Sequence, residues 1–144
     1  MQQIRDLVKE DPKAIWLVAD MAYPATNIPA MAGADCLNTT QTYPQKTRWE
    51  MLDPEGEYED IYNRYCHIRA SLGSKTMLEL VSTDYVEVTL SPEDLKKLNI
   101  RYIVSTNDFD ERIAVGTTNI FTDSGIELQK YYEGAQLSIY RCVY

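Results

Sequence analysis

Five residues in the first half of the chain could together bind a sugar or a phosphate. They combine flat aromatic rings with an amide and a guanidinium: Tyr43, Trp49, Tyr62, Asn63 and Arg64. Aromatic rings stack on sugar rings, while amide and guanidinium groups form hydrogen bonds with hydroxyls or phosphates. A structural interpretation stays open beside this one, with Tyr62 in the core on one face of a helix and Arg64 in solvent. The five residues are therefore candidate ligand-binding residues.

Asp20 and His67 are the candidates for acid–base chemistry. Asp20 directly follows an apolar run, where open α/β sheets carry functional groups, although Asp is also a common turn residue. His67 is the only histidine of the chain. In the alternative function that these two residues support, the chain is a stand-alone cytoplasmic α/β enzyme that acts on a small ligand.

No motif identifies a reaction, a cofactor or a metal site. The sequence lacks the glycine-rich phosphate-binding motifs, the HExxH zinc motif and the GxSxG nucleophile motif. Cys66 and His67 are neighbours on an expected helix, where their side chains diverge by about 100°, so they do not form a nucleophile pair. An acidic loop lacks the EF-hand pattern and is interpreted as solvated: Asp108, Asp110 and Glu111. We therefore predict no catalytic residue, no cofactor and no metal.

The three cysteines, Cys36, Cys66 and Cys142, are widely spaced and form no CxxC motif. With a single histidine in the chain, a zinc site is unsupported. Three buried thiols are the favoured interpretation, because free cysteine behaves as a small hydrophobic residue. One disulfide with one free thiol stays open as an alternative.

Composition and charge narrow the class of protein. The chain has 144 residues, of which 44% are hydrophobic and 25% charged, as in one folded domain. Its net charge of −8 argues against a nucleic-acid partner, because such binding requires a cationic surface. The same acidity makes a protein-interaction module a third functional class. The longest apolar stretch, residues 14–19, is far shorter than the about 20 residues that span a membrane.

The pattern of apolar residues predicts the elements that position the candidates. Residues 3–10 can form a short helix, and the apolar run at residues 14–19 indicates a buried strand. A long irregular loop follows at residues 21–57, interrupted by four prolines. Loops of this length in a compact domain are often functional, and this one holds Tyr43 and Trp49.

The strongest predicted helix covers residues 58–72. Its apolar and aromatic residues recur at spacings of three and four: Tyr58, Ile61, Tyr62, Tyr65, Ile68 and Leu72. Residues 85–90 alternate between apolar and polar types, which indicates a half-buried strand, and residues 76–81 are predicted to pair with it in a hairpin.

The last third of the chain adds one helix and two further strands. Ser91, Pro92 and Asp94 form a helix start with a capping box. Strands are predicted at residues 100–105 and 137–144, a polar loop at 107–112, and either helix or strand at 122–133. This order predicts an α/β (α+β) fold, with one domain over residues 1–144 and a mixed β-sheet on which the helices pack. The long irregular loop follows the first strand.

Three stretches of the sequence resemble a known family. The first comprises Asn27-Ile-Pro29, Gly33, Tyr43-Pro44, Trp49 and Ile61-Tyr-Asn-Arg-Tyr-Cys-His-Ile68. The others are Leu95-Lys-Lys-Leu-Asn-Ile-Arg-Tyr-Ile-Val-Ser105 and Leu137-Ser-Ile-Tyr-Arg141. Together they resemble the C-terminal soluble domain of bacterial multi-pass membrane proteins, which look like glycosyltransferases of the GT-C type that use lipid-linked sugars.

The resemblance implies a domain excised from a larger membrane protein, at the extracytoplasmic face of the bacterial cell membrane. The catalytic acid of such enzymes lies in loops near membrane helices that are missing from this chain, so no catalytic residue carries over. We expect a non-catalytic domain that assists cell-surface glycan or polysaccharide assembly by contacting a ligand or packing on the membrane part. Its expected partners are the transmembrane part of the parent protein and a glycan or lipid-linked sugar.

Overall fold

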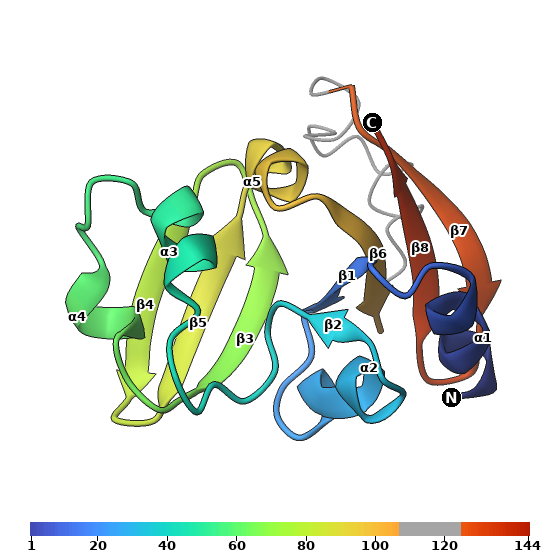
Figure 1. Cartoon of the computed structure of the whole chain (residues 1–144), viewed down its shortest axis with the longest axis horizontal. Helices are drawn as coiled ribbons and strands as arrows, with labels where there is room; N and C mark the ends of the chain where they lie inside the picture. Colours follow the sequence, from blue (N-terminus) through green and yellow to red (C-terminus); the bar gives the residue numbers. More distant parts are fainter. Residues whose placement is uncertain (107–124) are drawn as a thin grey trace.

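A computed structural model describes residues 1–106 and 125–144, and within them it has one mixed sheet with short helices (Figure 1). This confirms the predicted α/β class. The eight strands of this part are β1 (Ile15–Ala19), β2 (Asp35–Cys36), β3 (His67–Leu72), β4 (Met77–Ser82), β5 (Tyr85–Leu90), β6 (Ile100–Ser105), β7 (Glu127–Glu133) and β8 (Ser138–Val143). Its helices are α1 (Gln2–Glu10), the 3-10 turn η1 (Ala25–Asn27), α2 (Ile28–Met31), α3 (Lys46–Leu52), α4 (Glu59–Tyr62) and α5 (Pro92–Lys97). None of these helices is long and apolar enough to cross a membrane.

Parallel strands form the centre of the sheet, and antiparallel strands form its two edges. The strand order is β4-β5-β3-β1-β6-β8-β7, with β2 beside the beginning of β1. Strands β1, β3, β5 and β6 are parallel, whereas β4, β8 and β7 pair antiparallel with their neighbours. The chain moves outward from β1 to β3 and β5 and then returns to β6 on the other side of β1. This reversal places a topological switch point at the carboxyl end of β1.

Helices cover both faces of the sheet, because successive residues of a strand point to opposite faces. Leu17 and Ala19 of β1 belong to the core that α3, α4 and α5 cover. Trp16 and Val18 belong to a second core, to which α1 contributes Ile4. Burying each large apolar side chain stabilises the fold by about 1.5–3 kcal/mol, so β1 holds the two layers together.

Most of the predicted elements are confirmed. They correspond to α1, β1, the β4–β5 hairpin, β6 and β8. The predicted capping box is complete, since the Asp94 N–H donates to the Ser91 hydroxyl at 3.3 Å and the Ser91 N–H donates to the Asp94 carboxylate at 2.8 Å. Of residues 122–133, the described part is largely strand β7. The acidic loop with Asp108, Asp110 and Glu111 lies outside the described residues.

The predicted helix over residues 58–72 is wrong. One helical turn, α4, ends at Tyr62, and the chain then enters β3. The apolar residues of the second half also fit a period of two, because Cys66, Ile68 and Ala70 are buried while the residues between them are half-exposed. β3 pairs with β5 along its whole length, so tertiary pairing outweighs the local helical pattern.

The region predicted as a long irregular loop, residues 21–57, contains the short elements η1, α2, β2 and α3. Its apolar side chains are shared between the two cores. Cys36 packs in the core beside α1, whereas Trp49 and Leu52 pack in the core on the other face of the sheet. The loop is therefore anchored on both faces of the sheet.

All three cysteines are buried free thiols, as the favoured interpretation predicts. Burial raises the pKa of Cys36 and Cys142 to about 12 and the pKa of Cys66 to about 11. The thiols are therefore protonated at neutral pH and act as small apolar side chains rather than as nucleophiles.

Candidate functional site

The sheet is split between β1 and β3. β1 pairs with β6 at all five of its residues, from Ile15 with Ile100 to Ala19 with Ser105. On its other side, β1 pairs with β3 at one position only, Ala19 with Ala70. The two strands diverge toward their beginnings, and residues 37–41 occupy the space between them.

Asn38 completes the edge of β1 with its side chain. The Val18 N–H donates to Asn38 Oδ1 at 2.9 Å, and Asn38 Nδ2 donates to the Val18 carbonyl at 2.7 Å. One residue earlier, the Leu37 N–H donates to the Trp16 carbonyl at 2.8 Å. Asn38 is fully buried, and its amide supplies the two hydrogen bonds that a neighbouring strand would otherwise make.

Gln41 fastens the other end of this segment to β3. Its main chain exchanges two hydrogen bonds with Cys66, at 2.7 and 3.0 Å. Its side-chain nitrogen donates to the carbonyls of Tyr62 and Arg64, each at 2.8 Å, and its Oε1 accepts from Trp49 Nε1 at 2.7 Å. Because Gln41 is buried, these bonds hold α3, α4 and β3 together around one amide.

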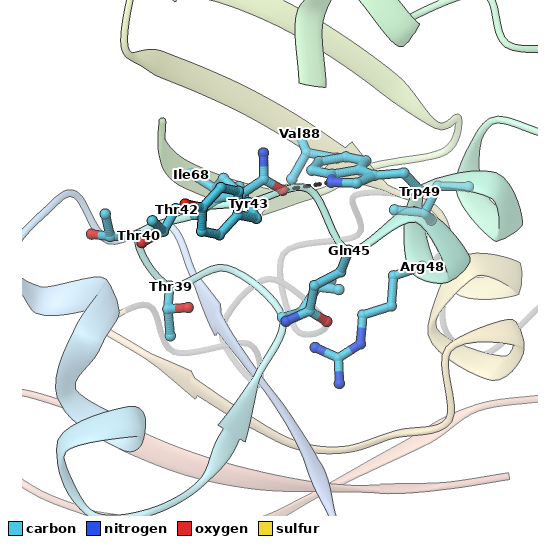
Figure 2. A pocket seen from close by; sticks show the side chains of 12 residues that line it. Thr39, Thr40, Thr42, Tyr43, Gln45, Arg48, Trp49, Ile68 and Val88 are labelled. Atoms are coloured by element: carbon cyan, nitrogen blue, oxygen red, sulfur yellow. Dashed lines mark hydrogen bonds between the residues drawn. The ribbon is translucent and has the colours of Figure 1, made fainter. Parts of the chain in front are cut away.

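A cavity of about 260 Å³ opens beside the segment, between it, α3 and the sheet (Figure 2). Its floor is apolar and includes Ile68 of β3 and Val88 of β5. Its polar groups are hydroxyls, amides and one guanidinium, carried by Thr39, Thr40, Gln41, Thr42, Gln45 and Arg48. Tyr43 and Trp49 add aromatic rings. Such a lining can bind and orient a polyhydroxylated ligand through hydrogen bonds and ring stacking.

Three of the predicted binding residues, Tyr43, Trp49 and Tyr62, lie at or below the cavity and differ in how far they are exposed. Tyr43 lines the cavity and is 83% exposed, so its ring is available to a ligand. Trp49 also lines the cavity, but its ring is buried and stacks on Tyr62 with centroids 4.8 Å apart and planes 2° from parallel. Tyr62 is buried below that ring, and burial raises the pKa of its hydroxyl. In this environment Tyr62 supports the position of Trp49.

The other two predicted residues lie outside the cavity. Asn63 is exposed and, with Tyr62, lines a different cavity of about 230 Å³. The Arg64 guanidinium donates to three main-chain carbonyls, those of Asp60, Ile61 and Thr83, at 2.7, 2.9 and 3.1 Å. These bonds join the end of α4 to the turn between β4 and β5, which gives Arg64 a structural role.

Asp20 and His67 lie at different places along the split. Asp20 is at the switch point after β1, with a φ of 59°, and its N–H donates to the carbonyl of Ala70. His67 is the first residue of β3, three residues before Ala70, or about 10 Å along the strand. Its Nδ1 is 3.0 Å from the hydroxyl of Thr40, and the ring of Tyr23 lies against its ring with centroids 4.1 Å apart and planes tilted by 31°. Each residue thus has its own set of neighbours.

The predicted binding residues leave out several polar residues between β2 and the first turn of α3, although the loop that holds them was predicted as a place for function. Thr39, Gln45 and Arg48 line the cavity, and Asn38 and Gln41 hold its wall in place. For Asn38, Thr39 and Gln41, the signal in the sequence is the polar run Asn38-Thr-Thr-Gln-Thr42 between Leu37 and Tyr43. A run of amides and hydroxyls next to buried residues indicates a segment whose side chains make defined hydrogen bonds. In the described part of the chain, no group of three or more His, Cys, Asp or Glu could hold a metal ion.

Comparison with known proteins gives a family without an assigned role. A family model described as a domain of unknown function (DUF7654) matches residues 1–144. No curated protein and no solved structure matches the chain.

Proposed function

The chain belongs to the DUF7654 family, and we propose that it is a non-catalytic domain that binds a glycan in the cavity beside Tyr43. In this proposal the domain belongs to a bacterial membrane protein of the glycosyltransferase-like type. It lies on the extracytoplasmic face of the membrane and assists glycan assembly there. The parent protein and its location rest on the sequence resemblance alone.

The observation that carries the proposal is the composition of the cavity. Three threonine hydroxyls, the Gln45 amide and one guanidinium line the cavity with an apolar floor, beside the exposed ring of Tyr43. A sugar presents the same combination, with hydroxyls around its rim and apolar faces that stack on aromatic rings. The described lining residues are Thr, Gln, Arg, aromatic and aliphatic types, which supply binding contacts rather than a general acid–base pair.

The volume of the cavity limits the size of the ligand that it can hold. Pockets for drug-sized molecules span about 300–1,000 Å³, and this cavity measures about 260 Å³. We therefore expect it to hold one sugar unit, with the rest of a glycan extending past Tyr43 into solvent. Binding of a single unit through a few hydrogen bonds is expected to be weak, so a longer glycan or several copies of the domain would raise the affinity.

The test is a titration of the isotope-labelled domain with monosaccharides and short glycans, followed by NMR. Binding should shift the amide signals of residues 39–45. Tyr43→Ala should weaken binding about tenfold without lowering stability, because the ring is 83% exposed. Tyr131→Ala, which removes a 47% exposed tyrosine from β7, is the matched control and should leave the affinity unchanged. Equal binding by wild type and Tyr43→Ala, or no shifts with any glycan, would contradict the proposal.

A second candidate function has one structural observation in its favour, the place of Asp20. Open α/β sheets bind ligands outside the carboxyl ends of their strands at a switch point, which is where Asp20 follows β1. In this alternative, a small ligand binds beside the Asp20 carboxylate. Asp20→Asn would then abolish small-molecule binding and leave the signals of Tyr43 unaffected, whereas glycan binding in the cavity would survive the same substitution.

A further inference from the structure

We propose that the outer edge of β4 is a docking site for an extended segment of a partner protein in which apolar and basic residues alternate. The segment adds one strand to the sheet beside residues 77–80. This interaction is separate from glycan binding, because none of the described residues that line the cavity lies on β4.

The main chain of β4 has a free side. β4 is the last strand of the sheet at one end, on the left in Figure 1. Among the described residues, the main chain of residues 77–80 forms hydrogen bonds with β5 alone. Successive residues of a strand direct their N–H and C=O groups to alternate sides, so half of these groups point away from β5. Such a free edge is a template for pairing with another strand.

The free edge covers the first four residues of β4. After Leu80 the register with β5 shifts. The turn that follows β4 is held by Arg64, which donates to the Thr83 carbonyl at 3.1 Å. A strand that pairs with four residues forms only a few main-chain hydrogen bonds, so we expect weak and reversible binding.

The two outer strands of the sheet differ in how they are protected from such pairing. β7 carries three charged side chains in seven residues, and Lys130 and Glu133 among them form an ion pair at 3.9 Å. Charged side chains discourage a second strand from adding to an edge. β4 has one charged residue, Glu79, and exposes apolar side chains, with Met77 at 57% and Leu80 at 39%. β4 is therefore the less protected edge.

The charges next to this edge indicate what the added strand carries. Arg69 of β3 pairs with Glu87 of β5, and Glu87 pairs with Glu79 of β4, so the three side chains form one row across the sheet. Two carboxylates that lie directly opposite each other repel, and one guanidinium stands beside them. The next position in the row, beyond Glu79, belongs to the added strand. A lysine or arginine there gives each carboxylate a basic neighbour.

The other face of β4 favours apolar residues between the basic ones. Leu78 and Leu80 alternate with Glu79, and Leu78 is buried in the core whereas Leu80 is partly exposed. An added strand alternates in the same way, so its residues next to Leu80 should be apolar. A second copy of this chain fits less well, because it brings its own Glu79 and a net charge of −8 to the edge.

The experiment titrates the isotope-labelled chain with three blocked hexapeptides and follows the amide signals by NMR. Valine and arginine alternate in the first peptide, and glutamate replaces arginine in the second. The third is the first peptide with a methyl group on every main-chain nitrogen, so it keeps its charge but donates no main-chain hydrogen bond. The first peptide should shift the signals of residues 77–80. The second should bind about tenfold more weakly, and the third should not bind at this edge.

Two variants with the same change of charge test the role of Glu79. Glu79→Gln should weaken binding of the arginine peptide about two- to fivefold, because it removes the carboxylate beside the added strand. Glu127→Gln makes the same change on β7, at the other end of the sheet, and should leave the affinity unchanged. Both side chains are exposed, so neither substitution should disturb the fold.

Several results would overturn this proposal. The basic character of the partner is overturned if the arginine and glutamate peptides bind equally, or if the two variants weaken binding alike. Strand addition at β4 is overturned if the methylated peptide binds as well as the first. It is also overturned if the first peptide leaves residues 77–80 unchanged and shifts only the acidic stretch 50–60, or shifts nothing.

Signals of residues 77–80 that move with protein concentration alone would show a second copy at the edge and would overturn a basic partner. Glycan binding is unaffected by any of these results, because it is measured at residues 39–45.

Discussion

The two edges of β1 are built in different ways. Toward β6, all five residues of the strand pair with main chain, and the sheet continues through β8 to β7, with register shifts only at Ile15/Trp16 and Lys130/Tyr132. On the opposite edge, Ile15 and Trp16 pair with the short strand β2 and Ala19 pairs with β3. Between them, the side chain of Asn38 supplies the hydrogen bonds for Val18. The edge toward β6 is closed by main-chain pairing along the whole strand, whereas the split edge has a wall of polar side chains next to a cavity.

The difference shows how a small domain can keep a cavity open against one face of its sheet. Main-chain pairing brings strands to within about 5 Å and closes the space between them. Pairing through a side-chain amide satisfies the same donors and acceptors while the neighbouring strand stays away. The inserted segment then brings its own hydroxyls and amides to the core side of the sheet. The following predictions test whether the split edge depends on these side chains in the way described.

The largest effect is expected for Asn38→Ala. The substitution leaves the buried N–H and carbonyl of Val18 without partners, at about 1–3 kcal/mol each, so the free energy of unfolding should fall by about 2–4 kcal/mol. It should also weaken glycan binding, because residues 37–41 lose their anchor on β1. Urea unfolding followed by circular dichroism measures the first effect, and NMR titration measures the second.

Ile139→Val on the β6 side of β1 is the matched control for that substitution. Ile139 is fully buried in β8, so the loss of one methylene should lower stability by about 1 kcal/mol. Glycan affinity should not change, because the cavity lies on the other side of β1. If Asn38→Ala cost no more than this control, the amide would not be replacing strand pairing.

A smaller effect is expected for Trp49→Phe. Phenylalanine keeps much of the stacking on Tyr62 but removes the N–H that donates to Gln41 Oε1. The buried oxygen then lacks a donor, and the free energy of unfolding should fall by about 2 kcal/mol. Gln41→Glu, which adds a buried charge at the same place, should cost more. If the Trp49→Phe variant were as stable as the wild type, the hydrogen bonds of the Gln41 amide would not be what stabilises the split edge.

The smallest expected effect is a loss of stability at high pH, caused by the buried thiols on the two sides of β1. The pKa of Cys36 on β2 and the pKa of Cys142 on β8 are both raised by burial, from 9.0 to about 12. The folded protein therefore keeps protons that the unfolded chain loses above pH 9, and stability falls as the pH rises from about 9 toward 12. At pH 10 each thiol should contribute about 1 kcal/mol of this loss.

Denaturant unfolding between pH 7 and pH 10.5 checks this expectation. Cys36→Ala and Cys142→Ala should each flatten the decline by a similar amount, because burial, unlike strand pairing, is equal on the two sides of β1. A decline that only one of these variants flattens would show that one side opens before the other.

Much of the fold could be predicted from the sequence where local pattern and tertiary environment agree. The apolar run of β1, the alternation in β5 and the capping box at Ser91 each indicate the observed element. The helix predicted over residues 58–72 failed because its apolar residues fit two periods at once. The pairing of β3 with β5 decided between them, and no local window contains that partner.

The candidate site could be predicted only in part. Tyr43 and Trp49 were found because aromatic residues stand out in a polar loop, and both line the cavity. Arg48 and Gln45 were left out of the candidate list, because local sequence does not show which way a side chain in this loop points. Arg64 has the residue type of a ligand-binding group, yet its donors are used by main-chain carbonyls up to 19 residues away.

By itself, the sequence determined the α/β class, the acidic charge, the buried thiols and the segment between β1 and β3 as the place to look for function. These properties follow from composition and local periodicity, which do not depend on contacts between distant parts of the chain. Only the tertiary structure decided that β1 and β3 separate and that Asn38 takes the place of a strand. Asn38 and its partner Val18 lie 20 residues apart, and Gln41 bonds residues 21 and 23 positions away. Contacts at such separations arise from the packing of the whole chain, and from them the cavity takes its shape.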